Sequence, residues 1–493
     1  MNRRKFTQSW GRKLFFGLSW PLSMIFGLVY LRSFIFPQSA EELLYFILTY
    51  VGHFGVLNIL VYYFLFSPIV LLMPSYYISR MWSLLLIVLL NGVILLDAIS
   101  FSSFHLHLFS FISPLLIQEG IENLFPSKIV MWIAALSLFI SAIMIWIKGE
   151  RNWRFMQGRF SNPVSNWYLY LILFFFIAGK AVFYLRPVNP QLAKVFPLNL
   201  VFKDENKTGA DNRRFFYSAD KVTCKSKKNP NIVMLVLKEW NSEQFNPEMM
   251  PKIFHLKDHS VFYSAHLNVG HNSRSGKFSL LYSLPASYQT LSQFKQPAFF
   301  SVMNKRGYEM VEIESDRNLA SLDTWLQNRS GDEIQPLFLS MFFEENALLA
   351  DTQVDEVILK LEQNGLLKDS YVIITGSYSG PGSQIIPLLI SSPERKADEV
   401  THITTVYDVV PSLMENFWEC GSVFKKVSIG KPLKKSGRDW FLASIEGGFK
   451  IVDLKNDNIL QVKDGGLTVF GTNPRYKLIF NALKIMTKFN RPH

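Results

Sequence analysis

Residues 231–241 read Asn-Ile-Val-Met-Leu-Val-Leu-Lys-Glu-Trp-Asn, and this stretch decides the fold of the C-terminal half. Its first seven residues form an almost unbroken apolar run that is rich in β-branched side chains. A short apolar run between polar residues predicts a strand buried on both faces, as in a parallel sheet covered by helices. In such sheets ligands and catalytic groups lie at the carboxyl ends of the strands. This chain places Lys238, Glu239 and Trp240 there.

Strand and helix signals alternate after this stretch, which predicts an α/β domain with a mainly parallel sheet. The further strands that we expect, each an apolar run, are 308–313, 336–343, 371–375 and 385–390. The helices that we expect are 301–307, which ends at Gly307, 351–365, which is capped at Gly365, and 404–417, which Pro411 interrupts.

Five apolar stretches precede this pattern, each close to or above the ~20 residues that cross a bilayer as a helix. They are 14–36, 43–73, 81–104, 129–147 and 167–185. The second is long enough to span with tilt or to continue along the membrane interface. The sequence therefore predicts three parts: a transmembrane domain over 1–185, an interfacial linker over 186–230 and an α/β domain over 231–493.

The net charge of +12 is concentrated around the apolar segments. Residues 1–185 carry 13 Lys and Arg against 6 Asp and Glu, whereas the remainder carries 38 against 33. This distribution favours a membrane protein over a nucleic-acid-binding protein, whose basic residues would gather on a polar surface.

Basic residues in the short loops predict the orientation of the five spans. Those on one side are Arg3, Arg4, Lys5, Arg12, Lys13, Arg80, Lys148, Arg151, Arg154 and Arg159. The opposite loops hold mainly glutamates, namely Glu41, Glu42, Glu119 and Glu122. We therefore expect the N-terminus in the cytoplasm and everything after Leu185 on the far side of the membrane.

Several polar residues lie in or beside the predicted spans. His53 and Asp97 fall within them, where ionisable groups are costly and usually face a partner. We expect a structural hydrogen bond between helices rather than proton transport. His105 and His107 follow the third span, where they could form a metal pair or lie at the level of the headgroups.

The chain has two cysteines, Cys224 and Cys420, both beyond the last span. In an oxidising compartment they could form one disulfide. With 196 positions between them, the sequence does not decide whether they meet.

An ordered set of segments makes the chain resemble a known family. The segments are 50–54 (Tyr-Val-Gly-His-Phe), 95–108, Arg186-Pro187, Pro197-Leu198, 231–241, Met250-Pro251, 270–281, Gly307-Tyr308, 372–375 and 408–413. With the five spans they resemble the lipoteichoic-acid-synthase and sulfatase branch of the alkaline phosphatase superfamily. Within that branch they are similar to the YejM/PbgA (LapC) family of the bacterial inner membrane. The resemblance implies a sulfatase-like α/β domain in the periplasm.

Active members of that superfamily hold a divalent metal at the carboxyl edge of the sheet, beside a Thr or Ser nucleophile. Here the first metal-binding carboxylate falls on Lys238, and the nucleophile falls on Asn272, next to Ser273. The expected Asp-His pair is replaced by Gly376-Ser377-Tyr378, and a His-x-His motif by Pro381-Gly382-Ser383. The resemblance thus implies a pseudoenzyme without metal or other cofactor. A substitute triad of Glu239, His271 and Ser273 is the less favoured possibility.

The resemblance also implies a function. Members of the family sense lipopolysaccharide or its lipid A part at the periplasmic face. They restrain the adaptor LapB, which delivers the deacetylase LpxC to the protease FtsH. The stretch corresponding to the lipid site is Arg186, Lys194, Pro197, Leu198, Asn199, Leu200, Val201, Phe202 and Lys203. Here Asp204 and Glu205 follow Lys203, where the relative carries adjacent arginines.

Arg80 and the Lys148–Arg159 loop are the residues that we expect to contact a LapB-like adaptor. Two other functions remain open. One is a metal-dependent membrane phosphotransferase or phosphatase acting on lipid headgroups. The other is cardiolipin binding or transport. The substituted ligand positions favour the regulator.

Overall fold

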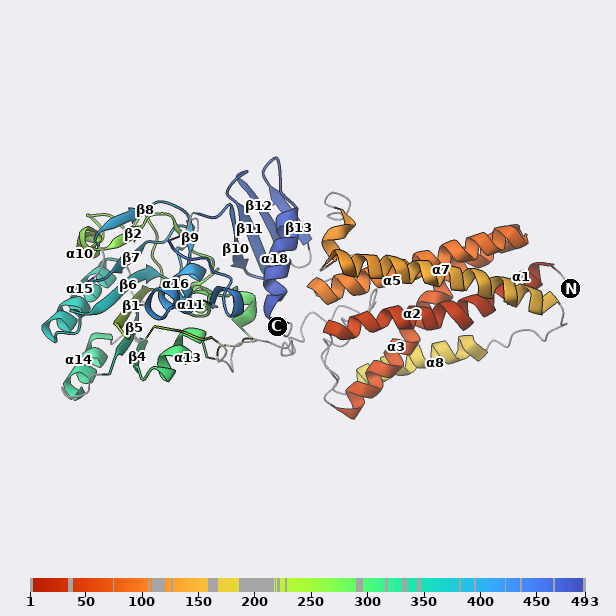
Figure 1. Cartoon of the computed structure of the whole chain (residues 1–493), viewed down its shortest axis with the longest axis horizontal. Helices are drawn as coiled ribbons and strands as arrows, with labels where there is room; N and C mark the ends of the chain where they lie inside the picture. The colour runs from red at the N-terminus through yellow and green to blue at the C-terminus, as the bar shows by residue number, and fades with distance from the viewer. Residues whose placement is uncertain are drawn as a thin grey trace. The chain divides into compact units, whose positions relative to one another are not determined.

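The structure is a computed structural model, which describes the following part of the chain. It comprises residues 3–33, 39–73, 75–104, 107–108, 120–125, 127–157, 167–185, 217, 219, 222–226, 228–289, 296–314, 318–329, 335–343, 347–380, 383–393, 396–421, 423–434, 437–463 and 466–490. The chain forms two compact units, Met1–Arg214 and Phe215–His493 (Figure 1). We call them the membrane unit and the α/β unit.

The membrane unit contains five helices long and apolar enough to cross a bilayer, which confirms the predicted number. They are Phe6–Leu31, Ala40–Leu72, Tyr76–Phe104, Lys128–Arg154 and Trp167–Leu185. The fourth helix extends to Arg154, beyond the predicted end of its apolar run at residue 147. Polar side chains do not by themselves end a helix, so it continues past the apolar segment. The last three are α5 (Tyr76–Phe104), α7 (Lys128–Gln157) and α8 (Trp167–Leu185), and a short 3-10 helix, η4 (Ile121–Leu124), precedes α7.

The first two spans are each divided by a π-helical turn. The first span is built from α1 (Arg3–Leu14), the turn η1 (Phe15–Ser19), α2 (Trp20–Gly27) and the 3-10 helix η2 (Leu28–Ser33). The second is built from α3 (Ala40–Leu60), the turn η3 (Val61–Phe66) and α4 (Ser67–Leu72). Each π-helical turn is followed within two residues by a proline, Pro21 or Pro68. Proline lacks an N–H and clashes with the preceding turn, so the widened turn accommodates it.

Glycines allow α3 and α8 to approach closely. A Cβ atom on Gly52 would lie 2.4 Å from the main-chain nitrogen of Phe176, and one on Gly179 would lie 2.7 Å from Thr49 Oγ1. Small residues at such positions let membrane helices pack through dispersion forces.

Buried amides connect three spans. Ser23 Oγ of α2 donates to Asn91 Oδ1 of α5 at 3.0 Å, and Asn58 Nδ2 of α3 donates to Ser23 Oγ at 3.1 Å. In a bilayer such groups have no water to bind, so their mutual satisfaction favours one arrangement of the helices.

The α/β unit is built on a seven-stranded sheet of order β4-β5-β1-β6-β7-β2-β8. The strands are β1 (Asn231–Leu237), β2 (Val261–Tyr263), β4 (Glu309–Glu314), β5 (Leu337–Phe343), β6 (Ser370–Gly376), β7 (Leu388–Ser391) and β8 (Asp398–Val400). The neighbours β4, β5, β1 and β6 are all parallel, whereas β7 is antiparallel to both β6 and β2. The sheet is therefore mainly parallel, as predicted.

Side chains of the central strand β1 alternate between two hydrophobic clusters. Ile232, Met234 and Val236 enter one cluster, and the alternate residues 233, 235 and 237 enter the other. The helices that supply the first cluster include α11 (Ser273–Tyr282), α13 (Ala298–Lys305) and α16 (Val409–Trp418). Those that supply the second include α10 (Pro251–His255) and α15 (Ala347–Gln363). The sheet is thus covered on both faces, which confirms the reading of residues 231–237.

The remaining elements extend this core. They are α14 (Asn318–Asn328), α17 (Val423–Lys426), the short parallel pair β3 (His266–Leu267) and β9 (Thr404–Thr405), and the 3-10 helices η6 (Leu256–His259), η7 (Ala286–Tyr288), η8 (Val406–Asp408) and η9 (Lys488–Asn490). A second, antiparallel sheet has the order β10 (Trp440–Ile445), β11 (Gly448–Asp453), β12 (Asn458–Lys463) and β13 (Gly466–Phe470). Together with α18 (Lys477–Thr487) it completes the unit. The main-chain N–H of Ser444 donates to Val269 O at 2.8 Å and joins this sheet to the core.

The structure corrects the expectation for Pro411 and decides the question of the disulfide. Pro411 does not interrupt a helix, because α16 begins only at Val409 and the proline lies in its first turn, where the N–H has no intrahelical partner. Cys224 and Cys420 form a disulfide, which ties the segment before β1 to the end of α16.

Candidate functional site

The carboxyl end of β1 is held by main-chain hydrogen bonds that continue past the strand. The N–H of Lys238 donates to Phe343 O of β5 at 2.8 Å, and the N–H of Ser377 donates to Leu237 O at the same distance. These bonds fix the main chain at the edge of the sheet while the side chains of Lys238 and Glu239 remain exposed. A cation, Lys238, therefore lies at the end of β1, the position at which the resemblance led us to expect a metal-binding carboxylate.

Asn272, at the expected nucleophile position, is the N-cap of α11. Its side-chain oxygen accepts a hydrogen bond from the N–H of Ser275 at 2.9 Å, and Ser275 Oγ accepts one from the N–H of Asn272 at 3.0 Å. This reciprocal capping box satisfies two donors at the start of the helix. The amide thus has a structural role and no nucleophilic atom.

The first turn of α11 packs directly on the end of β6. A Cβ atom on Gly276 would lie 1.6 Å from Ser377 O, so only glycine permits this approach. It brings Ser273 Oγ to 2.7 Å from Ser377 Oγ, and Ser377 Oγ donates to Lys238 O at 2.9 Å. Since the single proton of Ser377 is used there, Ser273 donates to Ser377. We call Ser273, Ser377 and the Lys238 carbonyl the hydroxyl chain.

The hydroxyl chain does not activate a nucleophile. A nucleophilic serine needs a neighbouring base that takes its proton. The chain ends instead on a main-chain carbonyl, which accepts a hydrogen bond but is not a base near neutral pH. The geometry positions the start of α11 against the sheet and offers no route for the proton of Ser273.

Glu239 and the following loop occupy the other side of the edge. A Cβ atom on Gly380 (φ +76°) would lie 2.4 Å from Glu239 Oε1, so this carboxylate lies against the main chain of Gly380. Ser379 Oγ donates to Ser383 O at 2.7 Å, which closes the turn. Pro381, also a predicted substituted position, lies outside the described residues.

These donors do not fit the divalent metal that the fold family implies. A metal site for phosphoryl chemistry needs several carboxylates or imidazoles around one ion. The described residues of the edge offer the carboxylate of Glu239 and the ammonium group of Lys238. The hydroxyl groups of Ser273 and Ser377 bond to each other and to the Lys238 carbonyl, and the amide of Asn272 caps α11. Within the described ranges there is no group of three His, Cys, Asp or Glu residues that could hold a metal ion.

The substitute triad is not assembled either. Ser273 bonds to Ser377, Glu239 lies against Gly380, and the main-chain N–H of His271 donates to Ser275 Oγ. Among these described residues no hydrogen bond joins His271 to Ser273 or to Glu239.

Of the polar residues predicted in or beside the spans, the structure describes Asp97, His107 and His53. Asp97 is buried and accepts hydrogen bonds from the hydroxyl of Tyr30, on the first span, and from the N–H of Leu108. His107 Nδ1 lies 2.7 Å from Asp97 Oδ2. Asp97 therefore has the expected role between helices, and it also holds the chain that follows α5. His53 is buried on α3, and His105 lies outside the described residues.

The predicted lipid stretch is not described by the structure, since Arg186, Lys194 and all of 197–203 fall outside the described residues. The predicted adaptor residues are described in part. Arg80 is buried and forms an ion pair with Glu150, and Arg154 pairs with the other carboxylate oxygen at 2.6 Å. Nothing in the sequence singles out Glu150 or Tyr30, because each acts through a residue far away in the chain. Ser377 was expected only as a substituted position, and its bond to Ser273 was not predicted.

Comparison with known proteins shows which family and which individual proteins the chain is similar to. Residues 1–199 match the family described as domain of unknown function DUF3413. Over 478 residues the chain is 22% identical to inner membrane protein YejM of Salmonella typhi, with 80% of this chain and 81% of that protein covered. An uncharacterised protein of Haemophilus influenzae is 20% identical over 490 residues, with 83% and 82% covered.

Solved structures similar to this chain include the following two proteins. One is an alkaline phosphatase superfamily protein from Vibrio parahaemolyticus, with 12% identity, a TM-score of 0.42, and coverage of 54% of this chain and 88% of that one. The other is the lipoteichoic acid synthase LtaP from Listeria monocytogenes, with 13% identity, a TM-score of 0.42, and coverage of 55% and 96%. The chain is thus similar to the inner membrane protein YejM along most of both chains, and its residues 1–199 match the DUF3413 family.

Proposed function

We propose that this protein is a catalytically degenerate inner-membrane regulator of lipopolysaccharide synthesis and outer-membrane homeostasis. It senses lipopolysaccharide, through lipid A, at the periplasmic face. It restrains the proteolysis of LpxC by LapB and FtsH, so that synthesis matches demand. The homology to YejM and the resemblance to its family support this proposal.

The observation that carries the proposal is which residues occupy the carboxyl edge of the sheet. The superfamily carries out metal-dependent chemistry there, and this chain has Lys238, the capping amide of Asn272 and the hydroxyl chain instead. An ammonium group repels a divalent cation, and a serine whose proton leads only to a carbonyl is not activated. These residues suit a structural role, so binding and regulation explain the architecture better than catalysis does.

Binding of lipid A requires cations for its phosphates and an apolar surface for its acyl chains. Arg186, Lys194 and Lys203 supply the cations in the proposed stretch, and Leu198, Leu200, Val201 and Phe202 supply the apolar side chains. The restraint of LapB is assigned to the basic end of the membrane unit, at Arg80 and the Lys148–Arg159 segment.

A complementation experiment separates this regulator from an enzyme. Deletion of the gene is expected to lower LpxC, because its proteolysis is no longer restrained, and to lower the amount of lipopolysaccharide. The full-length Ser273→Ala, Ser377→Ala variant is expected to restore both to wild-type levels. An Arg186→Gln, Lys194→Gln variant is expected to alter the LpxC level, because lipid sensing is impaired.

The comparison can fail in two informative ways. If deletion leaves LpxC and lipopolysaccharide unchanged, the regulatory function is refuted. If the hydroxyl variant accumulates in the membrane like the wild type yet behaves like the deletion, a membrane phosphotransferase or phosphatase becomes the better explanation. Ser383→Ala, in the loop after β6, is the matched control, because its hydroxyl lies outside the hydroxyl chain.

A further inference from the structure

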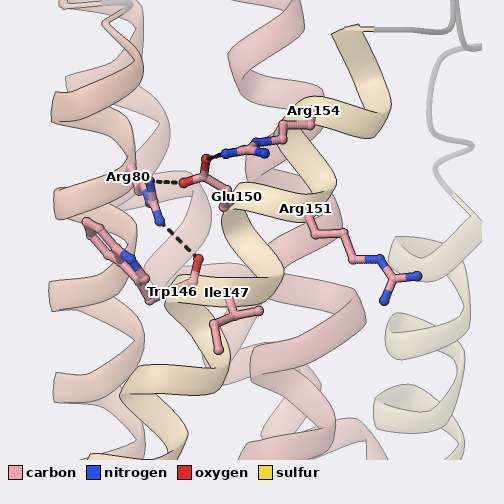
Figure 2. A pocket seen from close by; sticks show the side chains of 6 residues that line it. All are labelled: Arg80, Trp146, Ile147, Glu150, Arg151 and Arg154. Carbon is pink, nitrogen blue, oxygen red and sulfur yellow. Dashed lines mark hydrogen bonds and ion pairs between the residues drawn. The ribbon is translucent and has the colours of Figure 1, made fainter.

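A hollow lies between α5 and α7 where α5 begins and α7 nears its end. Its volume is ≈ 620 Å³, within the range of sites for small ligands. The residues that line it are Arg80, Trp146, Ile147, Glu150, Arg151 and Arg154 (Figure 2). We call it the arginine hollow. None of these residues belongs to the sheet edge described above.

Arg80 is built into the wall of the arginine hollow. Its Nη1 donates to Glu150 and, at 2.8 Å, to the hydroxyl of Tyr76, and its Nη2 donates to Trp146 O at 3.3 Å. Its guanidinium also lies 3.5 Å from the ring centre of Trp146. A buried arginine held on three sides keeps one rotamer, so its guanidinium is preorganised.

One donor of this arginine lacks an acceptor. Arg80 Nε is buried and has no hydrogen-bond partner among the residues that the structure describes. Buried donors in proteins are nearly always paired, with protein, water or ligand. The unpaired N–H therefore calls for an acceptor that the described residues do not supply.

The charges that line the hollow are not balanced. Three arginines line it against one carboxylate. Glu150 already serves two of them, with Oε2 toward Arg80 and Oε1 2.6 Å from Arg154. Figure 2 shows these three side chains together and Arg151 turned away along α7. A surplus of positive charge beside an orphaned donor calls for an anion.

The apolar part of the site indicates what kind of anion. Trp146 and Ile147 are exposed beside the arginines, and exposed apolar side chains continue down α7 at Ile143, Ile140 and Leu136. This helix is long and apolar enough to cross a membrane. A soluble anion or an acidic protein segment would fill the polar end and leave this surface uncovered. An amphiphile covers both.

We propose that the arginine hollow binds the phosphodiester headgroup of an anionic phospholipid, in the leaflet on the side of the N-terminus. The acyl chains lie along the exposed face of α7. Basic pockets between membrane helices recognise lipid headgroups in this way. This site is separate from the proposed lipid A stretch. It shares Arg80, Arg151 and Arg154 with the residues proposed to contact a LapB-like adaptor, but its test measures lipid binding alone and does not depend on the proposed regulatory function.

The test is native mass spectrometry of the full-length protein in detergent, titrated with phosphatidylglycerol. We expect one tightly bound phosphatidylglycerol per chain, and binding of phosphatidylcholine with the same acyl chains that is at least about fivefold weaker. Arg151→Gln, Arg154→Gln is expected to weaken phosphatidylglycerol binding by about 25-fold, from roughly fivefold for each lost cation. Arg151→Gln alone is expected to give about fivefold.

Lys148→Gln is the matched control, because Lys148 is an exposed cation on the same helix that does not line the hollow. It should bind phosphatidylglycerol like the wild type. An unchanged affinity in the double variant, an equal loss in the control, or equal binding of phosphatidylcholine would each overturn the proposal. So would binding of glycerol 3-phosphate as tight as that of the lipid, which would mark a soluble phosphate site, or displacement of the lipid by a poly-glutamate peptide, which would mark a protein-binding site.

Discussion

His266 makes the stability of the α/β unit sensitive to acid. The ring is fully buried on β3, with Nδ1 2.8 Å from Thr404 Oγ1, and Nε2 has no hydrogen-bond partner within the described part of the chain. Burial, together with the positive charge of Arg438, lowers the pKa of His266 from 6.5 to about 3. The folded protein therefore keeps this imidazole neutral at mildly acidic pH.

The sign and size of the effect follow from linkage. Between pH 6.5 and about 3 the unfolded chain binds a proton at His266 that the folded chain does not. The contribution is thus fully present above pH 6.5 and is lost as the pH falls. On lowering the pH from 8 to 5, His266 alone should reduce the free energy of unfolding by about 2 kcal/mol.

The assay is urea unfolding of residues 215–493, followed by tryptophan fluorescence at pH 8 and at pH 5. His266→Asn keeps a polar atom near Thr404 but cannot titrate, so its loss of stability should be about 2 kcal/mol smaller than that of the wild type. His271→Asn is the control, because His271 is an exposed histidine outside the β3–β9 pair, and this variant should lose as much stability as the wild type. Equal losses for His266→Asn and the wild type would refute the reasoning.

Three further predictions concern packing and the disulfide. Cys420→Ser should lower the free energy of unfolding of the α/β unit by about 5 kcal/mol in urea, because the bond to Cys224 closes a loop of 196 positions; no loss would show that the pair does not form. Gly276→Ala should cost about 1–3 kcal/mol in the same assay, because its Cβ collides with Ser377 O; an unchanged midpoint would contradict the close approach. Gly52→Ala should lower the melting temperature of the full-length protein in detergent, since the new methyl pushes α8 away; an unchanged or higher value would count against this packing.

The elements with long, regular patterns could be predicted from the sequence. The apolar run 231–237 is β1, with the predicted ends, because nothing polar interrupts it. The helix expected at 351–365 is α15, which ends at Gln363, and Gly365 follows it in the left-handed conformation (φ +67°) that glycine adopts without strain. These features depend on neighbours in the chain.

The features that escaped prediction depend on contacts between distant segments. Ser273 and Ser377 meet only because Gly276 lets α11 touch β6, and the sequence does not show which helix lies there. The ion pair of Arg80 with Glu150 joins residues 70 positions apart. Pro411 was misjudged because the rule that proline breaks a helix does not apply to its first turn, and the sequence did not place the start of α16.

The measurement that tests the central claim most directly is the metal content of the purified full-length protein. The protein is incubated with Mn²⁺ or Zn²⁺, desalted and analysed by elemental mass spectrometry. Because Lys238 and the hydroxyl chain occupy the sheet edge, we predict that essentially no ion is retained. About one tightly held ion per chain, lost on substitution of Glu239 or His271, would contradict a degenerate site and restore the superfamily's metal-dependent chemistry.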